Sequence, residues 1–115
     1  MMGIAIYDLA SPIMKNTNAI VALNVKDARP AQQYACIHCG RCVSACPMGL
    51  NPTAYAKAMK VDDKDDRAAR LVEAKLNLCM ECGSCSFICP SRRPLVETNR
   101  LAKADLRNYQ ATKKN

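Results

Sequence analysis

The chain has 115 residues, of which half are apolar, so its composition is not that of an intrinsically disordered tail. Its formal charge is +7, and it contains one Phe, four Tyr and no Trp. A single small domain is expected, and a core that lacks large aromatic side chains would be marginal at this size. The eight cysteines are therefore the residues expected to supply additional stability.

The start of the chain indicates in which compartment these cysteines work. Met1–Ala10 has no basic segment, contains Asp8 and is followed by Pro12, which is not the pattern of a secretory signal. No run approaches the roughly 18 apolar residues of a membrane-spanning helix. We expect no direct membrane span and a cytoplasmic location, where thiols are reduced or bound to metal.

Residues 1–33 are predicted to form a short β segment followed by a linker. The apolar runs Gly3–Tyr7 and Ala19–Leu23 are separated by Pro12 and turn-forming residues, and the polar segment Lys26–Gln33 follows them. Two short strands do not form a stable sheet alone. We therefore interpret this region as the end of a β-rich linking domain, which favours a fragment of a longer subunit over a split subunit. The alternative is that the runs pack on the helices that follow.

Residues 34–115 are predicted to be mainly α-helical, as in an α-helical, ferredoxin-like domain. Asn51 followed by Pro52 is a favourable helix start, and the acidic run Asp62–Asp66 suits the N-terminal end of another helix. The helices are predicted over Thr53–Lys60, Arg67–Leu76 and Leu95–Tyr109. Their buried stripes are predicted to be Leu71, Val72 and Leu76 in the second, and Leu95, Leu101, Ala102, Leu106 and Tyr109 in the third.

The cysteines form two copies of one pattern. Cys36–Pro47 and Cys79–Pro90 both read C-x-x-C-x-x-C-x-x-x-C-P, the run of bacterial two-cluster ferredoxins. Three thiolates at this spacing can surround one 4Fe–4S cluster, and the fourth Cys binds the other cluster. We therefore predict two 4Fe–4S clusters, one on Cys36, Cys39, Cys42 and Cys89 and the other on Cys79, Cys82, Cys85 and Cys46. Structural zinc, which uses closed sets of C-x-x-C pairs, and disulfides fit this pattern poorly.

The residues between the cysteines suit this role. Gly40 and Gly83 would let backbone N–H groups approach cluster sulfur, and Pro47 and Pro90 would end the loops. His38 is expected to be an exposed loop residue, with a hydrogen bond to sulfur as the alternative. Hydrogen bonds and exclusion of water set reduction potentials. The residues expected to exclude water are Ile37, Val43, Met48, Leu50, Met80, Phe87 and Ile88.

The sequence contains no pattern that would complete an enzyme. There is no glycine-rich phosphate loop and no visible pairing of a nucleophile with a base, so no catalytic site, NADH site or flavin site is predicted. A nucleic-acid-binding module is the alternative from another class. The basic residues of this chain are scattered, and the chain offers no aromatic platform on which bases could stack, so no nucleic-acid partner is expected.

The segments that follow the cysteine runs resemble a known family. Met48–Pro52 after the first run and Ser91–Val96 after the second closely resemble the C subunit of the Rnf electron-transport complex. The basic helix that ends in Lys103–Leu106 and the start Met1–Gly3 are similar as well. The resemblance covers nearly the whole chain, and residues 36–96 carry most of its specificity.

This resemblance implies a membrane-bound complex that couples electron flow between ferredoxin and NAD to ion transport. The C subunit would be peripheral, on the cytoplasmic side, with other subunits and a ferredoxin-like or flavin redox partner as neighbours. The family's flavin and nucleotide domain has no counterpart here, so neither ligand is carried over. The alternative is an iron–sulfur subunit of a cobalamin reductase-like, succinate dehydrogenase-like or heterodisulfide reductase-like enzyme. Arg100, Lys103 and Arg107 are expected to dock an acidic partner or the complex.

Overall fold

The computed structural model describes residues 5–29 and 32–114. Of Lys114, only the backbone is described. The chain divides into two compact units, residues 3–32 and residues 33–115. Each unit has its own internal contacts and is described by itself.

The first unit consists of turns and extended chain. Its backbone hydrogen bonds close local turns, such as Ser11 N–H to the Asp8 carbonyl at 3.2 Å and Thr17 N–H to the Met14 carbonyl at 2.9 Å. Residues 5–29 contain no strand and are all exposed, so the prediction of a strand over Ala19–Leu23 is wrong for this chain. Its backbone groups find no strand to pair with, and short isolated strands are not stable. Gly3 and Ile4 of the other predicted strand lie outside the described residues.

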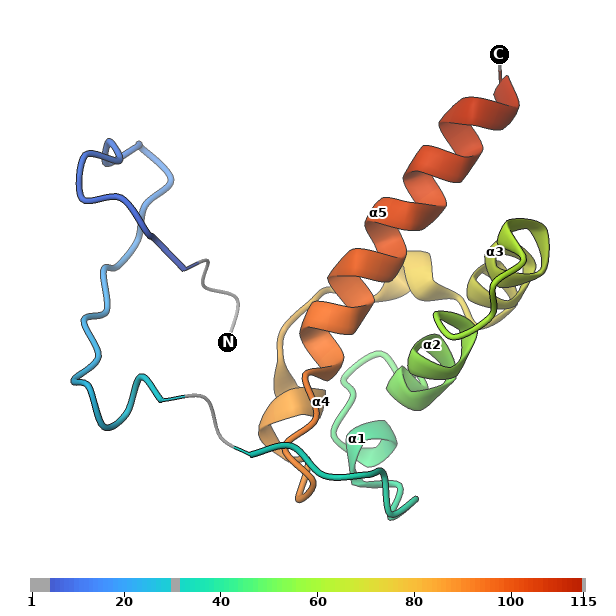
Figure 1. Ribbon diagram of the computed structural model, residues 1–115, viewed down its shortest axis with the longest axis horizontal. Coiled ribbons are helices and arrows are strands. Elements are labelled where there is room, and N and C mark those ends of the chain that lie inside the picture. The colour runs from blue at the N-terminus through green and yellow to red at the C-terminus, as the bar shows by residue number, and fades with distance from the viewer. Residues whose placement is uncertain (1–4, 30–31, 115) are drawn as a thin grey trace. The chain divides into compact units, whose positions relative to one another are not determined.

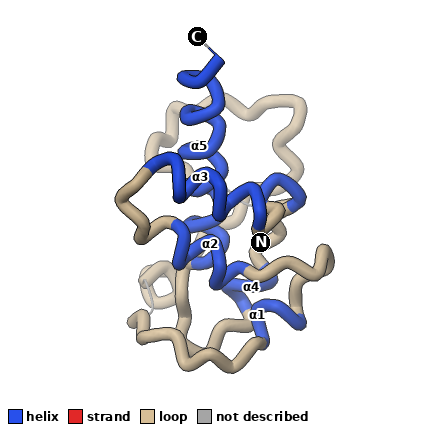
Figure 2. The backbone as a smooth tube through the Cα atoms, turned by 90° about the vertical axis from the view of Figure 1, so that its right-hand side faces the viewer, coloured by secondary structure: helices blue, strands red, loops and turns tan. Residues whose placement is uncertain are grey.

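The second unit is built from helices, which confirms the mainly α prediction (Figure 1). Their bounds are α1 Arg41–Ser44, α2 Pro52–Ala58, α3 Lys64–Glu73, the 3-10 helix η1 Leu76–Leu78, α4 Ser84–Phe87 and α5 Leu95–Lys114. Figure 2 shows α2 and α3 alongside α5, with α1 and α4 next to each other at the other end of the unit.

Side-chain caps fix where the middle helices begin. Asn51 Oδ1 accepts a hydrogen bond from Thr53 N–H at 3.1 Å at the start of α2. Asp63 Oδ1 accepts from Asp65 N–H at 3.0 Å, so α3 begins at Lys64, three residues before the predicted start.

The predicted second helix does not continue to Leu76. The helix α3 ends at Glu73, and Lys75 adopts a left-handed backbone with φ 56° before η1 begins. This break turns Leu76 into the core, where it is fully buried.

The helical core lies between α2, α3 and α5. Tyr55 is fully buried and its hydroxyl donates a hydrogen bond to the Ala74 carbonyl at 3.0 Å. Val72 and Leu101, which were predicted to be buried, are 56% and 64% exposed. Each precedes or follows the true core residue by one position, a turn of about 100° around a helix. The core residues are Leu50, Tyr55, Ala58, Ala68, Leu71, Leu76, Ala102 and Leu106.

Candidate metal centres

The two cysteine runs fold into the same loop. His38 and Gly40 in the first run have φ of 57° and 75°, and Glu81 and Gly83 in the second have φ of 57° and 83°. Each glycine then starts a one-turn helix, α1 or α4, that carries the third cysteine of its run. The left-handed conformation at this turn explains why a glycine occupies it in both runs.

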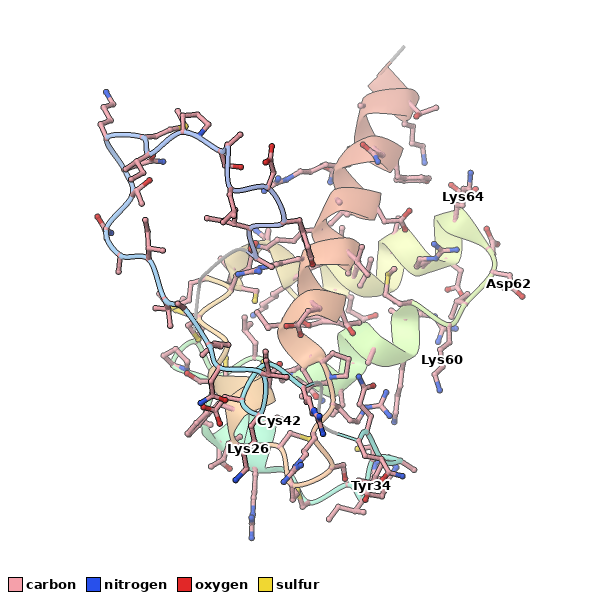
Figure 3. All side chains as sticks on the ribbon, turned by 60° about the vertical axis from the view of Figure 1, so that its left-hand side comes forward. Lys26, Tyr34, Cys42, Lys60, Asp62 and Lys64 are labelled. Carbon is pink, nitrogen blue, oxygen red and sulfur yellow. The ribbon has the colours of Figure 1, made fainter. Side chains whose placement is uncertain are left out.

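The first cavity brings together cysteines from both runs. It is lined by Cys36, Cys39, Cys42 and Cys89, and contains about 690 Å³ of space, part of it open to solvent. Cys42, on α1, is buried and is marked in Figure 3, whereas Cys39 is exposed. His38 lies on the same wall and is exposed, as predicted.

The second cavity has the reciprocal composition and is smaller. It is lined by Cys79, Cys82, Cys85 and Cys46, and contains about 360 Å³ of space. Cys85 is buried and the other three are partly buried. Each cavity thus combines three cysteines of one run with the last cysteine of the other.

The thiol chemistry of both cavities suits a cationic centre. All eight cysteines are free thiols. Burial raises the pKa of Cys42 and Cys85, and the negative charge of neighbouring thiolates adds to this rise. The Ser84 hydroxyl, 3.4 Å from Cys82 Sγ, lowers the pKa of Cys82. Thiolates crowded in this way repel each other, and bound iron would remove the repulsion.

Thiols are the donor groups that both cavities offer to a metal centre. In the described residues, no three His, Cys, Asp or Glu side chains are close enough to share one metal ion. Tetrahedral zinc, with a Zn–S distance of about 2.3 Å, would draw its four sulfurs to within roughly 4 Å of one another. The thiols of each set line a cavity, and soft thiolate donors of this kind suit iron–sulfur clusters.

Helix α5 covers one side of the second cavity through Asn99, which the sequence patterns did not single out. Asn99 is 1% exposed, and its Nδ2 lies 3.6 Å from Cys79 Sγ. Lys103 donates hydrogen bonds to the Cys79 carbonyl and to Glu81 Oε1, the latter at 2.9 Å. The signal for Asn99 was its helical spacing, four residues after Leu95 and three before Ala102.

These contacts change the expected role of the basic residues on α5. Lys103 is only 15% exposed, and Arg100 Nε lies 3.4 Å from Glu81 Oε2. The hydrogen bond from Lys103 is the main cause that lowers the pKa of Glu81, and the charge of Arg100 adds to it. Arg100 and Lys103 therefore hold the second loop against α5, and docking of a partner by these residues stays a prediction.

The residues predicted to exclude water divide into two groups. Ile37 and Val43 line the first cavity, while Met48, Leu50 and Met80 line the second, and all except Leu50 are exposed. Phe87 and Ile88 are 87% and 39% exposed, and a role for them in excluding water stays a prediction. Phe87 follows Cys85 by two positions and lies on the opposite side of α4, where it is 87% exposed.

Tyr55 connects the helical core to the second cavity. It lines that cavity as well as the core. Burial raises the pKa of Tyr55 to about 12, and the thiolates of Cys79, Cys46 and Cys85 add to the effect. The phenol therefore stays neutral beside the cysteines.

None of the helices in the described residues combines the length and apolarity needed to cross a bilayer.

Similarity to curated proteins confirms the resemblance found in the sequence. The C subunit of an ion-translocating oxidoreductase complex from Rhodobacter capsulatus is 37% identical over 113 residues, which are 98% of this chain and 21% of that protein. The corresponding C subunit from Methanosarcina acetivorans is 39% identical over 110 residues, 96% of this chain and 24% of that protein. The C subunit of the proton-translocating ferredoxin:NAD(+) oxidoreductase complex from Clostridium ljungdahlii is 47% identical over 53 residues, 46% of this chain and 12% of that protein.

This chain thus spans about a fifth of the length of the first of these relatives. The family described as "4Fe-4S dicluster domain" matches residues 32–93, more than half of the chain and all of both cysteine runs. The paired cavities, each with four thiols of the right chemistry, fit the two 4Fe–4S clusters that this family carries. The chain therefore belongs to the 4Fe-4S dicluster domain family.

Proposed function

We propose that this chain carries electrons one at a time between two 4Fe–4S clusters, as part of an Rnf-type complex. The observation that carries the proposal is the composition of the two cavities, since each holds three thiols of one run and the last thiol of the other. This is the arrangement in which two-cluster ferredoxins bind their clusters. The proposed ligands are Cys36, Cys39, Cys42 and Cys89 in the first site, and Cys79, Cys82, Cys85 and Cys46 in the second.

The two sites share a wall, which supports passage of electrons between them. Cys42 of the first site, Cys85 of the second and Leu95 of α5 form one buried cluster, against which Cys89 packs. Side chains of both sites are therefore in contact, and the gap that an electron must cross is short. The clusters supply the one-electron chemistry, while the chain fixes their positions and electrostatic surroundings.

Crossed ligation would also stabilise the fold. Cys46 follows α1 but faces the second cavity, and Cys89 follows α4 but faces the first. Iron bound in either site would join the two halves of the unit. Because metal binding and folding are coupled in small domains, the clusters would supply stability that the small helical core lacks.

The relatives support a place in a larger complex. Those from Rhodobacter and Clostridium are named as the C subunits of complexes that translocate ions or protons. We propose that residues 34–115 form the two-cluster domain of such a subunit, peripheral and on the cytoplasmic side of the membrane. Its neighbours would be the other subunits and a ferredoxin-like or flavin redox partner. Residues 1–33 would be the end of a β-rich linking domain, whose strands could cover apolar side chains such as Ile20 and Val21, now 66% and 71% exposed.

Anaerobic purification with iron and sulfide analysis tests this function. About eight irons and eight sulfides per chain are expected, from two clusters of four. The reduced protein should show the electron paramagnetic resonance (EPR) spectrum of two interacting centres. A colourless protein that contains zinc would contradict the proposal. A pull-down from solubilised membranes tests the place in the complex. A tagged complex should retain this chain, and an untagged complex should not.

A further inference from the structure

We propose that Asn99 is a positioning residue of the second site, where its amide donates a hydrogen bond to the Cys79 sulfur and raises the reduction potential of the cluster bound there. The inference rests on the proposed function, since it assumes that the second site holds a cluster. It concerns one side chain of α5, which belongs to neither cysteine run.

The position of Asn99 shows that the amide is placed against sulfur. Nδ2 lies 3.6 Å from Cys79 Sγ, within the range of a hydrogen bond to sulfur, and Asn99 lines the second cavity. Leu95 and Ala102 lie on the same buried face of α5 and are 2% and 0% exposed. An apolar side chain would be the ordinary choice at such a position, because burial of an amide costs free energy unless it is hydrogen-bonded.

The carbonyl oxygen of the Asn99 amide also supports a role for the amide at the sulfur. In the described part of the chain, Asn99 Oδ1 is buried and has no hydrogen-bond partner. Most buried polar atoms in native proteins are paired, so an amide placed only for stability would be expected to satisfy both ends. Turning the amide over would set Oδ1, a second acceptor, against the thiolate. The amide is therefore oriented so that Nδ2 donates to sulfur, and this orientation leaves Oδ1 without a partner.

Neighbouring contacts hold α5 at this distance from the loop. Lys103, one turn further along, donates to the Cys79 carbonyl and to Glu81. Val96 N–H donates to Ser86 Oγ at 2.8 Å, which joins the start of α5 to α4. Anchors on both sides of Asn99 leave its amide little freedom to move away from the sulfur.

A hydrogen bond to a ligand sulfur affects the two redox states unequally. Reduction adds one negative charge to the cluster and its thiolates, so a donor stabilises the reduced state more than the oxidised state. In the described residues, no side-chain amide donates to a cysteine of the first cavity, although Asn51 lines it. The two clusters would therefore differ in potential even though their loops share one backbone conformation.

The test is a potentiometric titration of the full chain, monitored by EPR. Asn99→Leu keeps the approximate size of the side chain and removes the donor. One of the two midpoint potentials should fall by about 59 mV. For a one-electron step, this equals a tenfold change in the ratio of reduced to oxidised cluster. The other midpoint should stay in place, and about eight irons per chain should remain.

Further variants separate tuning of the potential from a structural role. Asn99→Gln keeps an amide and should recover part of the shift. Asn108→Leu removes an exposed amide from the same helix and should move neither midpoint. Asn99→Val, whose side chain has no hydrogen-bonding group, provides a second donor-free variant and should reproduce the fall.

Two results would overturn the inference while the proposed function stands. One is a full complement of iron with unchanged midpoints in both donor-free variants. The other is loss of one cluster from both variants, because Asn99 would then be needed to hold the cluster rather than to set its potential. Absence of iron from the unmodified chain would instead mean that the proposed function itself is wrong.

Discussion

The two metal sites share one loop but differ in what surrounds it. Gly40 and Gly83 adopt the same left-handed conformation, and a one-turn helix follows each. The second loop is held by α5 through Asn99 and Lys103, whereas the first loop has Cys39 exposed and encloses the larger cavity. The cysteine spacing thus determines the shape of the loop, and the long helix outside the repeat makes the sites unequal.

The second site also lies closer to the helical core. Cys46 and Cys79 pack against the core residues of α2, α3 and α5, while Cys42 and Cys89 of the first site belong to the separate cluster around Leu95. Substitutions in the core should therefore destabilise the second cluster before the first. Chelators and other reagents in solution should reach the first cluster before the second.

The largest expected effect is the loss of a whole cluster when a crossed ligand is removed. Cys46→Ser should reduce the iron content from about eight to about four per chain, because a serine hydroxyl replaces the thiolate poorly. A second substitution shows which cluster was lost. Adding Cys82→Ser should cost no further iron, whereas adding Cys39→Ser should remove the rest.

The reciprocal variant is the control for this prediction. Cys89→Ser combined with Cys39→Ser should retain about four irons, and combined with Cys82→Ser it should retain none. The opposite dependence, with Cys46 grouped with Cys39, would show that each run binds its own cluster and would remove the crossed assignment.

Truncation in the core should produce the next largest effect. Leu71 is fully buried, so Leu71→Ala should lower the free energy of unfolding of the cluster-loaded protein by about 2–5 kcal/mol. Val72→Ala, at the adjacent and 56% exposed position, is the matched control and should cost less than about 0.5 kcal/mol. Anaerobic denaturant titration followed by circular dichroism measures both. Equal losses in the two variants would place the core elsewhere.

Exposure of Cys39 should make the first cluster the more vulnerable one. With an iron chelator under anaerobic conditions, we expect the first cluster to be lost several-fold faster than the second, because solvent reaches its cavity more easily. The EPR signals of the Cys46→Ser and Cys89→Ser variants identify each cluster in the time course. Equal rates of loss would mean that α5 gives the second site no protection.

The smallest effect should come from the ion pairs behind the second loop. Glu81 is 28% exposed and binds both Lys103 and Arg100, so Glu81→Gln should cost about 1 kcal/mol or less in the same denaturant titration. Asp66→Asn breaks the more exposed pair with Arg70 on α3 and should cost less than Glu81→Gln. A larger cost for Asp66→Asn would show that α5 does not secure the second loop through these charges.

Local signals in the sequence predicted much of this unit. Asn51 and Pro52 mark the start of α2 because a cap and a fixed φ act within one turn. The two glycines were expected to let backbone N–H groups approach cluster sulfur, whereas their positive φ was not predicted. The family match confirms the two clusters predicted from the cysteine runs.

Features that depend on tertiary packing were not predictable in the same way. The break at Lys75 carries no proline or glycine, and it exists because Leu76 is buried in the core beyond it. The choice between Leu71 and Val72 as the buried residue depends on the angle at which α3 meets α5. Asn99 reads as an ordinary polar residue until α5 is placed beside Cys79.

Diffraction from anaerobically grown crystals, with anomalous data collected at the iron edge, tests crossed ligation most directly. We expect two groups of four iron atoms, with Cys89 Sγ bound in the group that also holds Cys36, and Cys46 Sγ in the group that holds Cys79. Iron bound by the four cysteines of a single run, or one zinc ion in place of each group, would contradict this account.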